Sequence, residues 1–315
     1  SSCFKKATTK FFNGLLGFVT DRQGHMMLHK MITRVWKSPA FFCRHLYVDV
    51  HAHLTDVKFH GIENQIHQKC EDAKVEYVII NGLDPVTNRQ VMELSHQFSR
   101  FLPALGIYPL DAACHVLEEH WNEFDFPPPA LFDIDHELNY IQEMAETKRL
   151  VAIGECGLDR HYVRTAPVMA QQEKVLRCLM RIAKENDLPI ILHSRKAEAR
   201  VFEMLQEEGV TRALFHCYMG KVKLGKRISD AGYFLSIPPA IARHETSSFH
   251  HLIRAVPLHS LLTETDSPYM GAEKHTINDP SQVPVVIQHV AGIKELTEEY
   301  VASCIRDNCK KLFRI

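Results

Sequence analysis

The sequence predicts a (β/α)8 TIM barrel that follows a basic N-terminal extension, and three observations lead to this fold class. The chain has 315 residues, enough for one barrel of roughly 250 residues plus an extension. From residue 46 onward, short apolar runs rich in β-branched residues alternate with amphipathic stretches. The first run is followed by His-Ala-His-Leu-Thr-Asp. The rival fold, a doubly wound open sheet, would usually carry a glycine-rich phosphate loop there.

Eight apolar runs are the expected strands, and repeated strand-then-helix units favour one parallel barrel. The expected strands cover residues 46–51, 75–81, 101–107, 150–155, 189–193, 213–216, 233–236 and 261–266. The expected helices cover residues 61–74, 86–99, 134–148, 171–187, 195–208, 222–231, 245–256, 283–294 and 297–313. Thr297, followed by two glutamates, is the expected N-cap of the last helix. The longest irregular stretch, 108–132, is expected to be a lid or binding loop.

Residues 1–44 differ from the body of the chain in their charge. They carry eight Lys or Arg and one acid, Asp21, although the whole chain has a net charge of −1. We interpret them as a separate basic extension, either disordered or a mitochondrial-type targeting segment. Residues 45–315 are the expected barrel domain. Since this domain is acidic, it is not expected to coat nucleic acid by general electrostatics.

Composition excludes several classes of protein. Hydrophobic residues make up 45% of the chain and charged residues 24%, which excludes a mainly disordered chain and a collagen. No apolar run approaches the ~18 residues of a membrane span, so we expect a soluble protein with no membrane partner. Nine cysteines, without a Cys-x-x-Cys pair, indicate a reducing compartment rather than a disulfide scaffold.

Histidines and acids stand at the carboxyl ends of the expected strands, where barrel active sites are built. Alternate residues of a strand share a face, so His51 and His53 can point together into the mouth of the barrel. The six candidate metal ligands are His51, His53, Glu155, His193, His216 and Asp266. A lone buried histidine is more often structural, but four histidines and two acids at strand ends favour a metal site.

Two divalent ions are the expected cofactors. Four imidazole nitrogens and two carboxylates suit zinc or manganese, and magnesium where water completes the shell. Glu155 is placed to bridge two ions, which would activate a water and neutralise charge on a phosphoryl oxygen. Asp266 could hold an ion and also accept a proton from that water, so Glu155 and Asp266 are the predicted catalytic residues.

The motifs resemble those of the TatD family of metal-dependent deoxyribonucleases. They are Asp-x-His-x-His from Asp49, Gly-Glu-x-Gly-Leu-Asp from Gly154, His-Ser-Arg from His193, His-Cys-Tyr-x-Gly from His216 and Glu-Thr-Asp-Ser-Pro from Glu264. The resemblance covers about residues 46–314 and is greatest to the animal subgroup called TatD domain-containing protein three. It implies a barrel hydrolase with a binuclear metal site that cleaves DNA, often as a 3′→5′ exonuclease.

The resemblance also assigns the ligands. It implies that His51, His53 and Asp266 bind one ion, that His193 and His216 bind the other, and that Glu155 bridges. Asp49 is expected to orient a ligand or a strand.

One position departs from the family pattern. The family commonly has Gly-x-His-Pro after the third strand, where this chain has Gly106-Ile107-Tyr108-Pro109. Tyr108 can donate a hydrogen bond to a substrate phosphate, but it cannot carry a positive charge near pH 7. We therefore expect altered substrate choice or rate with metal binding intact.

Three further residues lie next to candidate ligands: Arg195 has two possible roles, and Cys156 and Cys217 are expected to be packing residues. Arg195 could clamp a substrate phosphate or form a salt bridge with Asp159. Cys156 and Cys217 each follow a candidate ligand, so strand alternation predicts that both side chains face away from the mouth.

DNA is the expected substrate, and two rival functions stay open. One is another barrel hydrolase, acting on a phosphotriester, lactone or amide. Many members of that wider group bridge their metals with a carbamylated Lys on the fourth strand, and the present chain has Glu155 there. The other rival is a non-catalytic scaffold. The expected location is the cytoplasm or nucleus. Mitochondria are the alternative, because the basic extension resembles a targeting segment. Oligomeric state is left open.

Overall fold

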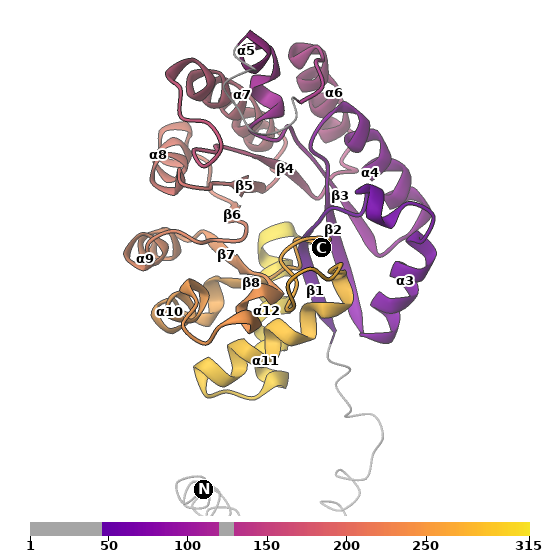
Figure 1. The fold of residues 1–315 in the computed structure, drawn as a ribbon, viewed down its shortest axis with the longest axis vertical. Helices are drawn as coiled ribbons and strands as arrows, with labels where there is room; N and C mark the ends of the chain where they lie inside the picture. Colours follow the sequence, from indigo (N-terminus) through magenta and orange to yellow (C-terminus); the bar gives the residue numbers. More distant parts are fainter. Residues whose placement is uncertain (1–45, 120–128) are drawn as a thin grey trace, which may run out of the picture. The chain divides into compact units, whose positions relative to one another are not determined.

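The computed structural model describes residues 46–119 and 129–315, and these residues form a barrel of parallel strands surrounded by helices (Figure 1). The basic extension and part of the expected lid, including Trp121, lie outside the described residues. The strands are β1 (Tyr47–Ala52), β2 (Val75–Asn81), β3 (Phe101–Leu105), β4 (Ala152–Gly157), β5 (Ile190–His193), β6 (Ala213–Phe215), β7 (Phe234–Ile237) and β8 (Leu261–Thr263).

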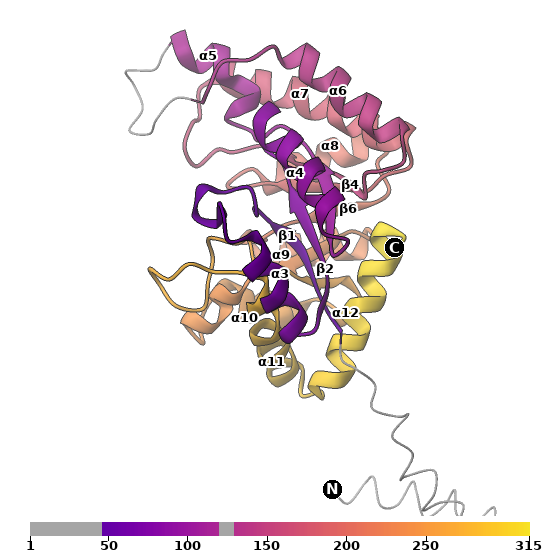
Figure 2. The same cartoon turned by 90° about the vertical axis from the view of Figure 1, so that its right-hand side faces the viewer.

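The helices fill the connections between the strands and cover the outside of the sheet (Figures 1 and 2). They are α3 (Glu63–Asp72), α4 (Pro85–Gln97), α5 (Cys114–Glu119), α6 (Ile134–Glu146), α7 (Ala166–Glu185), α8 (Glu198–Glu208), α9 (Val222–Asp230), α10 (Ser248–Ala255), α11 (Val283–Lys294) and α12 (Glu298–Phe313). None of the described helices is both long and apolar enough to cross a membrane.

The eight predicted strands are confirmed, and their burial explains why the sequence revealed them. Each strand pairs with the next in parallel, in the order β1 to β8. Helices cover one face of this sheet and the barrel interior covers the other. Val78, Ile79 and Ile80 of β2 are therefore completely buried in succession. Strands buried on both faces give continuous apolar runs.

Helix ends follow local capping chemistry. The Asp84 carboxylate accepts a hydrogen bond from the Thr87 N–H and caps α4, and the Thr297 hydroxyl accepts from the Tyr300 N–H, as predicted for α12. The start of α7 was predicted five residues too late. Pro167 lies in its first turn, where a proline costs no hydrogen bond, and this signal was overlooked.

A seam runs between the first and last strands. Within residues 46–119 and 129–315, the turn after β8 meets β1 through one isolated bridge between Ser267 and Ala52, and no continuous ladder joins β8 itself to β1. The His53 N–H donates to the Ser267 carbonyl at 2.8 Å, and the Asp266 N–H donates to the His51 carbonyl at 2.9 Å. Residues of the candidate site therefore help to close the barrel.

Candidate metal centre

All six predicted metal ligands lie together at the carboxyl ends of the strands. Histidine and carboxylate atoms form overlapping groups in which all ligand atoms lie within 4.8 Å of one another. The groups are His51 with His53 and Glu155, His51 with His216 and Asp266, and Glu155 with His193 and His216. Five strand ends separated by more than 200 residues of sequence thus meet at one place.

The first donor group is built on β1. The Nε2 atoms of His51 and His53 lie 3.1 Å apart, as strand alternation predicts for side chains on one face. Glu155 Oε2 lies 3.4 Å from the first of these nitrogens and 3.2 Å from the second. Asp266 Oδ1 lies 3.6 and 3.5 Å from the same two atoms. These four donor atoms are therefore close enough to one another to bind a single ion.

The second donor group uses the other oxygen of Glu155. Its Oε1 atom lies 2.9 Å from His193 Nδ1 and 2.9 Å from His216 Nε2. These two nitrogens are 3.4 Å apart. The two oxygens of one carboxylate are thus divided between two groups of imidazole nitrogens.

These spacings fit divalent cations. Ligands at about 2.0–2.2 Å from an ion lie about 2.9–3.5 Å from one another in octahedral or tetrahedral geometry. The distances within the two groups run from 2.9 to 3.6 Å. Nitrogen donors with two carboxylates suit zinc or manganese better than calcium. The residues present therefore fit a metal centre.

Burial and charge act against each other in this cluster. Burial, and then the nearby His216, lower the pKa of His51 to about 4, which favours the neutral imidazole that binds metal. Burial also lowers the pKa of His53, but hydrogen bonds to Asp266 and Glu155 outweigh it and raise the pKa to about 10. Although burial opposes it, the surrounding imidazoles lower the pKa of Glu155 and of Asp266 below their usual values.

Asp159 holds His193 in position for the second group. Its Oδ2 atom lies 2.8 Å from His193 Nε2, which leaves Nδ1 to face Glu155. The Asp159 N–H in turn donates to the buried amide oxygen of Gln172 at 3.0 Å. Carboxylates that orient a metal-ligating imidazole are typical of metal sites. The sequence suggested Asp159 only as a partner of Arg195, although its place directly after β4, in Gly157-Leu158-Asp159, was a usable signal.

Asp49, in β1, links that strand to the turn after β8 that carries Asp266. Its side chain is completely buried and accepts hydrogen bonds from the N–H groups of His51 (3.1 Å) and Thr265 (2.9 Å). The Thr265 hydroxyl donates to the second oxygen at 2.5 Å. Burial raises the pKa of Asp49 to about 7, although these hydrogen bonds oppose the shift. The expected orienting contacts are present.

Asp266 reaches the site from a turn rather than from a strand. The strand was predicted to run to residue 266, but β8 ends at Thr263. The backbone φ of Asp266 is +53°, in the left-handed region where Asp and Asn are tolerated better than most residues.

The prediction that Cys217 faces away from the mouth is wrong. Strand β6 ends at Phe215 and the φ of Cys217 is +43°, so strand alternation no longer applies. The Cys217 side chain lines the mouth beside His216 and Asp266. Cys156 is completely buried, as expected for a packing residue.

The two predicted substrate-binding residues lie at the edge of the donor groups. The Tyr108 ring stands edge-on to His193, with ring centroids 5.0 Å apart, and burial together with nearby carboxylates raises the pKa of its hydroxyl. Arg195 lines the same mouth cavity as His193 and Asp266. Asp159 is engaged by His193, and the Arg195 guanidinium lies 5.4 Å from the Tyr162 ring centroid instead.

Glu264 opens the Glu-Thr-Asp-Ser-Pro motif and is a buried carboxyl for which the sequence predicted no role. One oxygen accepts a hydrogen bond from the Ser236 hydroxyl at 2.6 Å and lies 3.9 Å from His216 Nδ1. Burial, reinforced by the charges of Asp266 and Asp49, raises the pKa of Glu264 well above its usual value. Its position two residues before Asp266 was the available signal.

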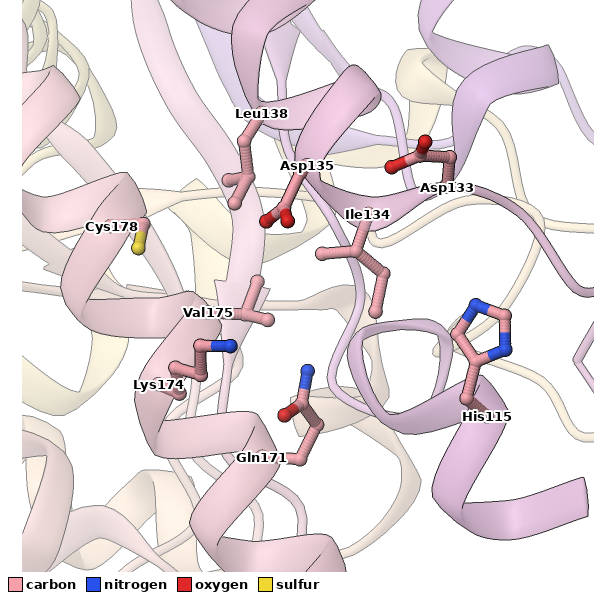
Figure 3. Close-up of a pocket in the computed structure, with 9 residues that line it drawn as sticks. All are labelled: His115, Asp133, Ile134, Asp135, Leu138, Gln171, Lys174, Val175 and Cys178. Atoms are coloured by element: carbon pink, nitrogen blue, oxygen red, sulfur yellow. The ribbon is translucent and has the colours of Figure 1, made fainter. Parts of the chain in front are cut away.

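Two cavities differ in size and chemistry. The mouth cavity has a volume of about 160 Å³ and is lined by residues that include His193, His216 and Asp266. A larger cavity of about 470 Å³ lies between α5, α6 and α7, where Asp135, Gln171 and Lys174 point into a common space (Figure 3). None of the residues that line the larger cavity belongs to the donor groups.

Comparisons with known proteins agree with this geometry. The family model described as TatD related DNase matches residues 48–314. Human deoxyribonuclease TATDN3 is 31% identical over 274 residues, which cover 84% of this chain and 94% of the relative. The metal-dependent hydrolase YabD of Bacillus subtilis is 30% identical over 85% of this chain and 98% of its own length.

A solved structure agrees as well. The TatD homologue YjjV of Escherichia coli superposes with a TM-score of 0.74 at 26% identity, over 87% of this chain and 99% of that one. The predicted family and TIM-barrel fold are thus confirmed. The chain belongs to the TatD family of metal-dependent hydrolases.

Proposed function

We propose that this protein is a divalent-metal-dependent deoxyribonuclease that hydrolyses phosphodiester bonds, acting on DNA ends as a 3′→5′ exonuclease. The observation that carries the proposal is the division of the Glu155 oxygens between two groups of donor nitrogens. Cations held about 3.5–4 Å apart by a shared carboxylate are typical of enzymes that cleave phosphodiesters. The human relative TATDN3 is named a deoxyribonuclease, which supports the same substrate class.

The proposed ligands follow from the distances. His51, His53 and Asp266 would hold one ion, His193 and His216 would hold a second, and Glu155 would contribute one oxygen to each. Zinc, manganese or magnesium ions bound there would lower the pKa of a coordinated water and offset charge on the phosphoryl oxygens.

The side chains then have separate tasks. Asp266, whose pKa is lowered by the neighbouring imidazoles, is ionised near neutral pH and accepts the proton of the attacking water at a carboxylate oxygen. Asp159 fixes the ring of His193, so that Nδ1 faces the reaction centre. Arg195 binds a phosphate oxygen of the substrate by charge-assisted hydrogen bonds. The Tyr108 hydroxyl donates a hydrogen bond to the same phosphate.

A nuclease assay tests the proposal. Purified protein is incubated with a 3′-recessed duplex and a single-stranded oligonucleotide, in Mg²⁺, Mn²⁺, Zn²⁺ or EDTA. We expect metal-dependent shortening from the 3′ end, absent in EDTA and lost in Asp266→Asn. The matched control is Asp307→Asn, on the exposed face of α12, which should cleave like the wild type. Absence of cleavage in every metal, or equal cleavage by Asp266→Asn, would move the assignment to the other barrel hydrolases.

Tyr108→His tests the departure from the family pattern. A histidine can carry a positive charge next to a substrate phosphate, whereas the phenol of Tyr108 stays neutral because its pKa is raised. We expect a changed kcat/KM on at least one DNA substrate with unchanged metal content. Unchanged kcat/KM on single-stranded, recessed and blunt DNA would contradict the assignment of Tyr108 to the phosphate.

For location we propose the cytoplasm or nucleus, with mitochondria as the alternative that the basic residues 1–44 favour. A fusion of residues 1–44 to a fluorescent protein distinguishes the two. Mitochondrial fluorescence would identify a targeting segment, whereas diffuse fluorescence would remove that alternative.

A further inference from the structure

One side chain outside the donor groups bonds to the backbone that supports them. Asn88 lies near the start of α4 and is completely buried. A buried amide needs partners for its oxygen and for its NH2 group, because each unpaired polar atom costs free energy. The partners of Asn88 therefore show which part of the fold it holds.

The Asn88 amide pairs with both backbone groups of Gly106. Its Oδ1 atom accepts from the Gly106 N–H at 3.2 Å, and its Nδ2 atom donates to the Gly106 carbonyl at 2.9 Å. The ladder of β3 with β2 ends at Ala104 and the ladder with β4 ends at Leu105. Gly106 is buried just beyond both ladders, so the amide of Asn88 supplies the partner that a neighbouring strand would otherwise provide.

A third hydrogen bond fixes the amide in one orientation. Asn88 Nδ2 also donates to Glu137 Oε1 of α6 at 2.7 Å. Glu137 is itself completely buried, and its other oxygen forms an ion pair with Arg89. Three of the four hydrogen bonds that an amide can make are thus present, which makes this a rigid anchor rather than a loose contact.

The anchored segment lies directly against the backbone of Glu155. The Glu155 N–H donates to the Gly82 carbonyl at 3.1 Å. A Cβ at Gly106 would lie 2.3 Å from the Glu155 carbonyl oxygen, and a Cβ at Gly82 would lie 2.0 Å from Asn88 Oδ1. The two glycines therefore allow an approach that any larger residue would prevent. The amide, the two glycines and the Glu155 peptide form one packed unit.

This unit lies behind the carboxylate that both donor groups use. Because the Glu155 oxygens reach nitrogens of both groups, a displacement of the Glu155 backbone changes both sets of distances at once. We propose that Asn88 is a positioning residue of the metal centre, which holds Gly82 and Gly106 against the Glu155 peptide and so sets how the carboxylate is shared. The proposal rests on the proposed metal centre and is independent of DNA as the substrate.

The test separates positioning from a loss of stability. Asn88→Ala removes the amide, whereas Asn88→Asp keeps its size and an acceptor oxygen but loses the donor to the Gly106 carbonyl. Glu137→Gln keeps an acceptor for Asn88 and loses the ion pair with Arg89, so it is the control for lost stability alone. Asn64→Ala, at an exposed position of α3, is the matched surface control.

Three measurements are made on each full-length variant. Urea unfolding in EDTA gives the free energy of unfolding without metal. Calorimetric titration gives the Kd for Mn²⁺, and the visible absorption spectrum of the Co²⁺-loaded protein reports the number and geometry of the ligands. Neither metal measurement requires a substrate.

We expect both Asn88 variants to raise the Kd for Mn²⁺ about tenfold, since loss of a group that orients a metal ligand costs about 10–100-fold in affinity. Their Co²⁺ spectra should differ from that of the wild type. Glu137→Gln should lower the free energy of unfolding and leave the Kd and the spectrum unchanged, and Asn64→Ala should match the wild type throughout.

Other outcomes would overturn the proposal. Folded Asn88 variants with the Kd and spectrum of the wild type would show that Asn88 only packs, and failure of both variants to fold would assign Asn88 to folding. A rise in Kd for Glu137→Gln as large as for Asn88→Ala would attribute the effect to stability. The predicted shifts without DNA cleavage in any metal would uphold the positioning role and refute the deoxyribonuclease function alone.

Discussion

Asp49 offers a sharp test of how the first donor group is held. Its carboxylate is completely buried and accepts the N–H groups of His51 and Thr265. The pairing of β1 with β2 is interrupted between Asp49 and Ala52, so the carboxylate supplies an acceptor where the strand ladder is irregular. Asp49→Ala leaves both buried N–H groups without that acceptor, whereas Asp49→Asn keeps an oxygen in the same place.

The expected effect follows from the number of hydrogen bonds lost. Asp49→Ala removes the acceptor of the His51 and Thr265 N–H groups and of the Thr265 hydroxyl. A buried donor without a partner costs about 1–3 kcal/mol, and the hydroxyl can rotate toward another acceptor, so the loss at the two fixed N–H groups should lower the free energy of unfolding by about 2–6 kcal/mol. That is a large part of the ~5–15 kcal/mol by which a typical domain is stable. Asp49→Asn should cost at most about 1.5 kcal/mol, the net value of one hydrogen bond.

Urea unfolding followed by circular dichroism, in EDTA so that metal does not contribute, measures both variants. Asp72→Ala, at the exposed end of α3, is the control and should stay within about 0.5 kcal/mol of the wild type. Metal titration should also show weaker binding by Asp49→Ala, because the displaced backbone carries His51. A cost below about 1 kcal/mol for Asp49→Ala, or equal costs for the two variants, would refute the reasoning.

Four further predictions test the fold and the site. Gly157 has a φ of +148°, and in Gly157→Ala the added Cβ would lie 1.9 Å from the His193 carbonyl oxygen. We therefore expect urea unfolding to show a loss of about 1–3 kcal/mol in the free energy of unfolding, together with lost activity. In Gly292→Ala, the added Cβ in helix α11 meets nothing within 4 Å, so this variant should be more stable than the wild type by about 0.5–1 kcal/mol. Equal thermal melts for Gly292→Ala and the wild type would contradict this. Mn²⁺ at 100 times its Kd should add about 2.7 kcal/mol of stability and raise Tm in a thermal melt; an unchanged rise in Glu155→Gln would argue against shared ligation. Arg200→Ala removes the ion pair with Glu173 that joins α8 to α7 and the ion pair with Glu207 within α8, and it should cost about 1 kcal/mol or less, with a smaller loss in 1 M NaCl; a salt-independent loss would indicate packing instead.

The sequence predicted the strands well because barrel strands are buried on both sides. Residues 75–81 were expected as one strand and are one, since every position there from Val78 onward is buried. The convergence of the six candidate ligands was also predictable, because strand ends of a parallel barrel meet whatever the lengths of the connections.

Contacts between connections were harder to predict. Strand periodicity stops where a strand stops, so it could not foresee that a left-handed turn brings the Cys217 side chain to the mouth, nor that Asp266 reaches the mouth from a turn and not from β8. The support of His193 by Asp159 and Gln172 depends on how a loop packs on α7, and no local pattern encodes that distance. Residue spacing predicts which face a side chain occupies, whereas its partner depends on tertiary packing.

The seam between β1 and β8 makes the first donor group depend on both ends of the barrel. His51 and His53 come from the first strand and Asp266 from the turn after the last, and the same residues supply the hydrogen bonds that join the two ends. A chain that stopped after β7 could still bring Glu155, His193 and His216 together, yet it would lack Asp266 and the contacts that hold the first strand. The first donor group would therefore form only once synthesis has finished and both ends of the barrel have met.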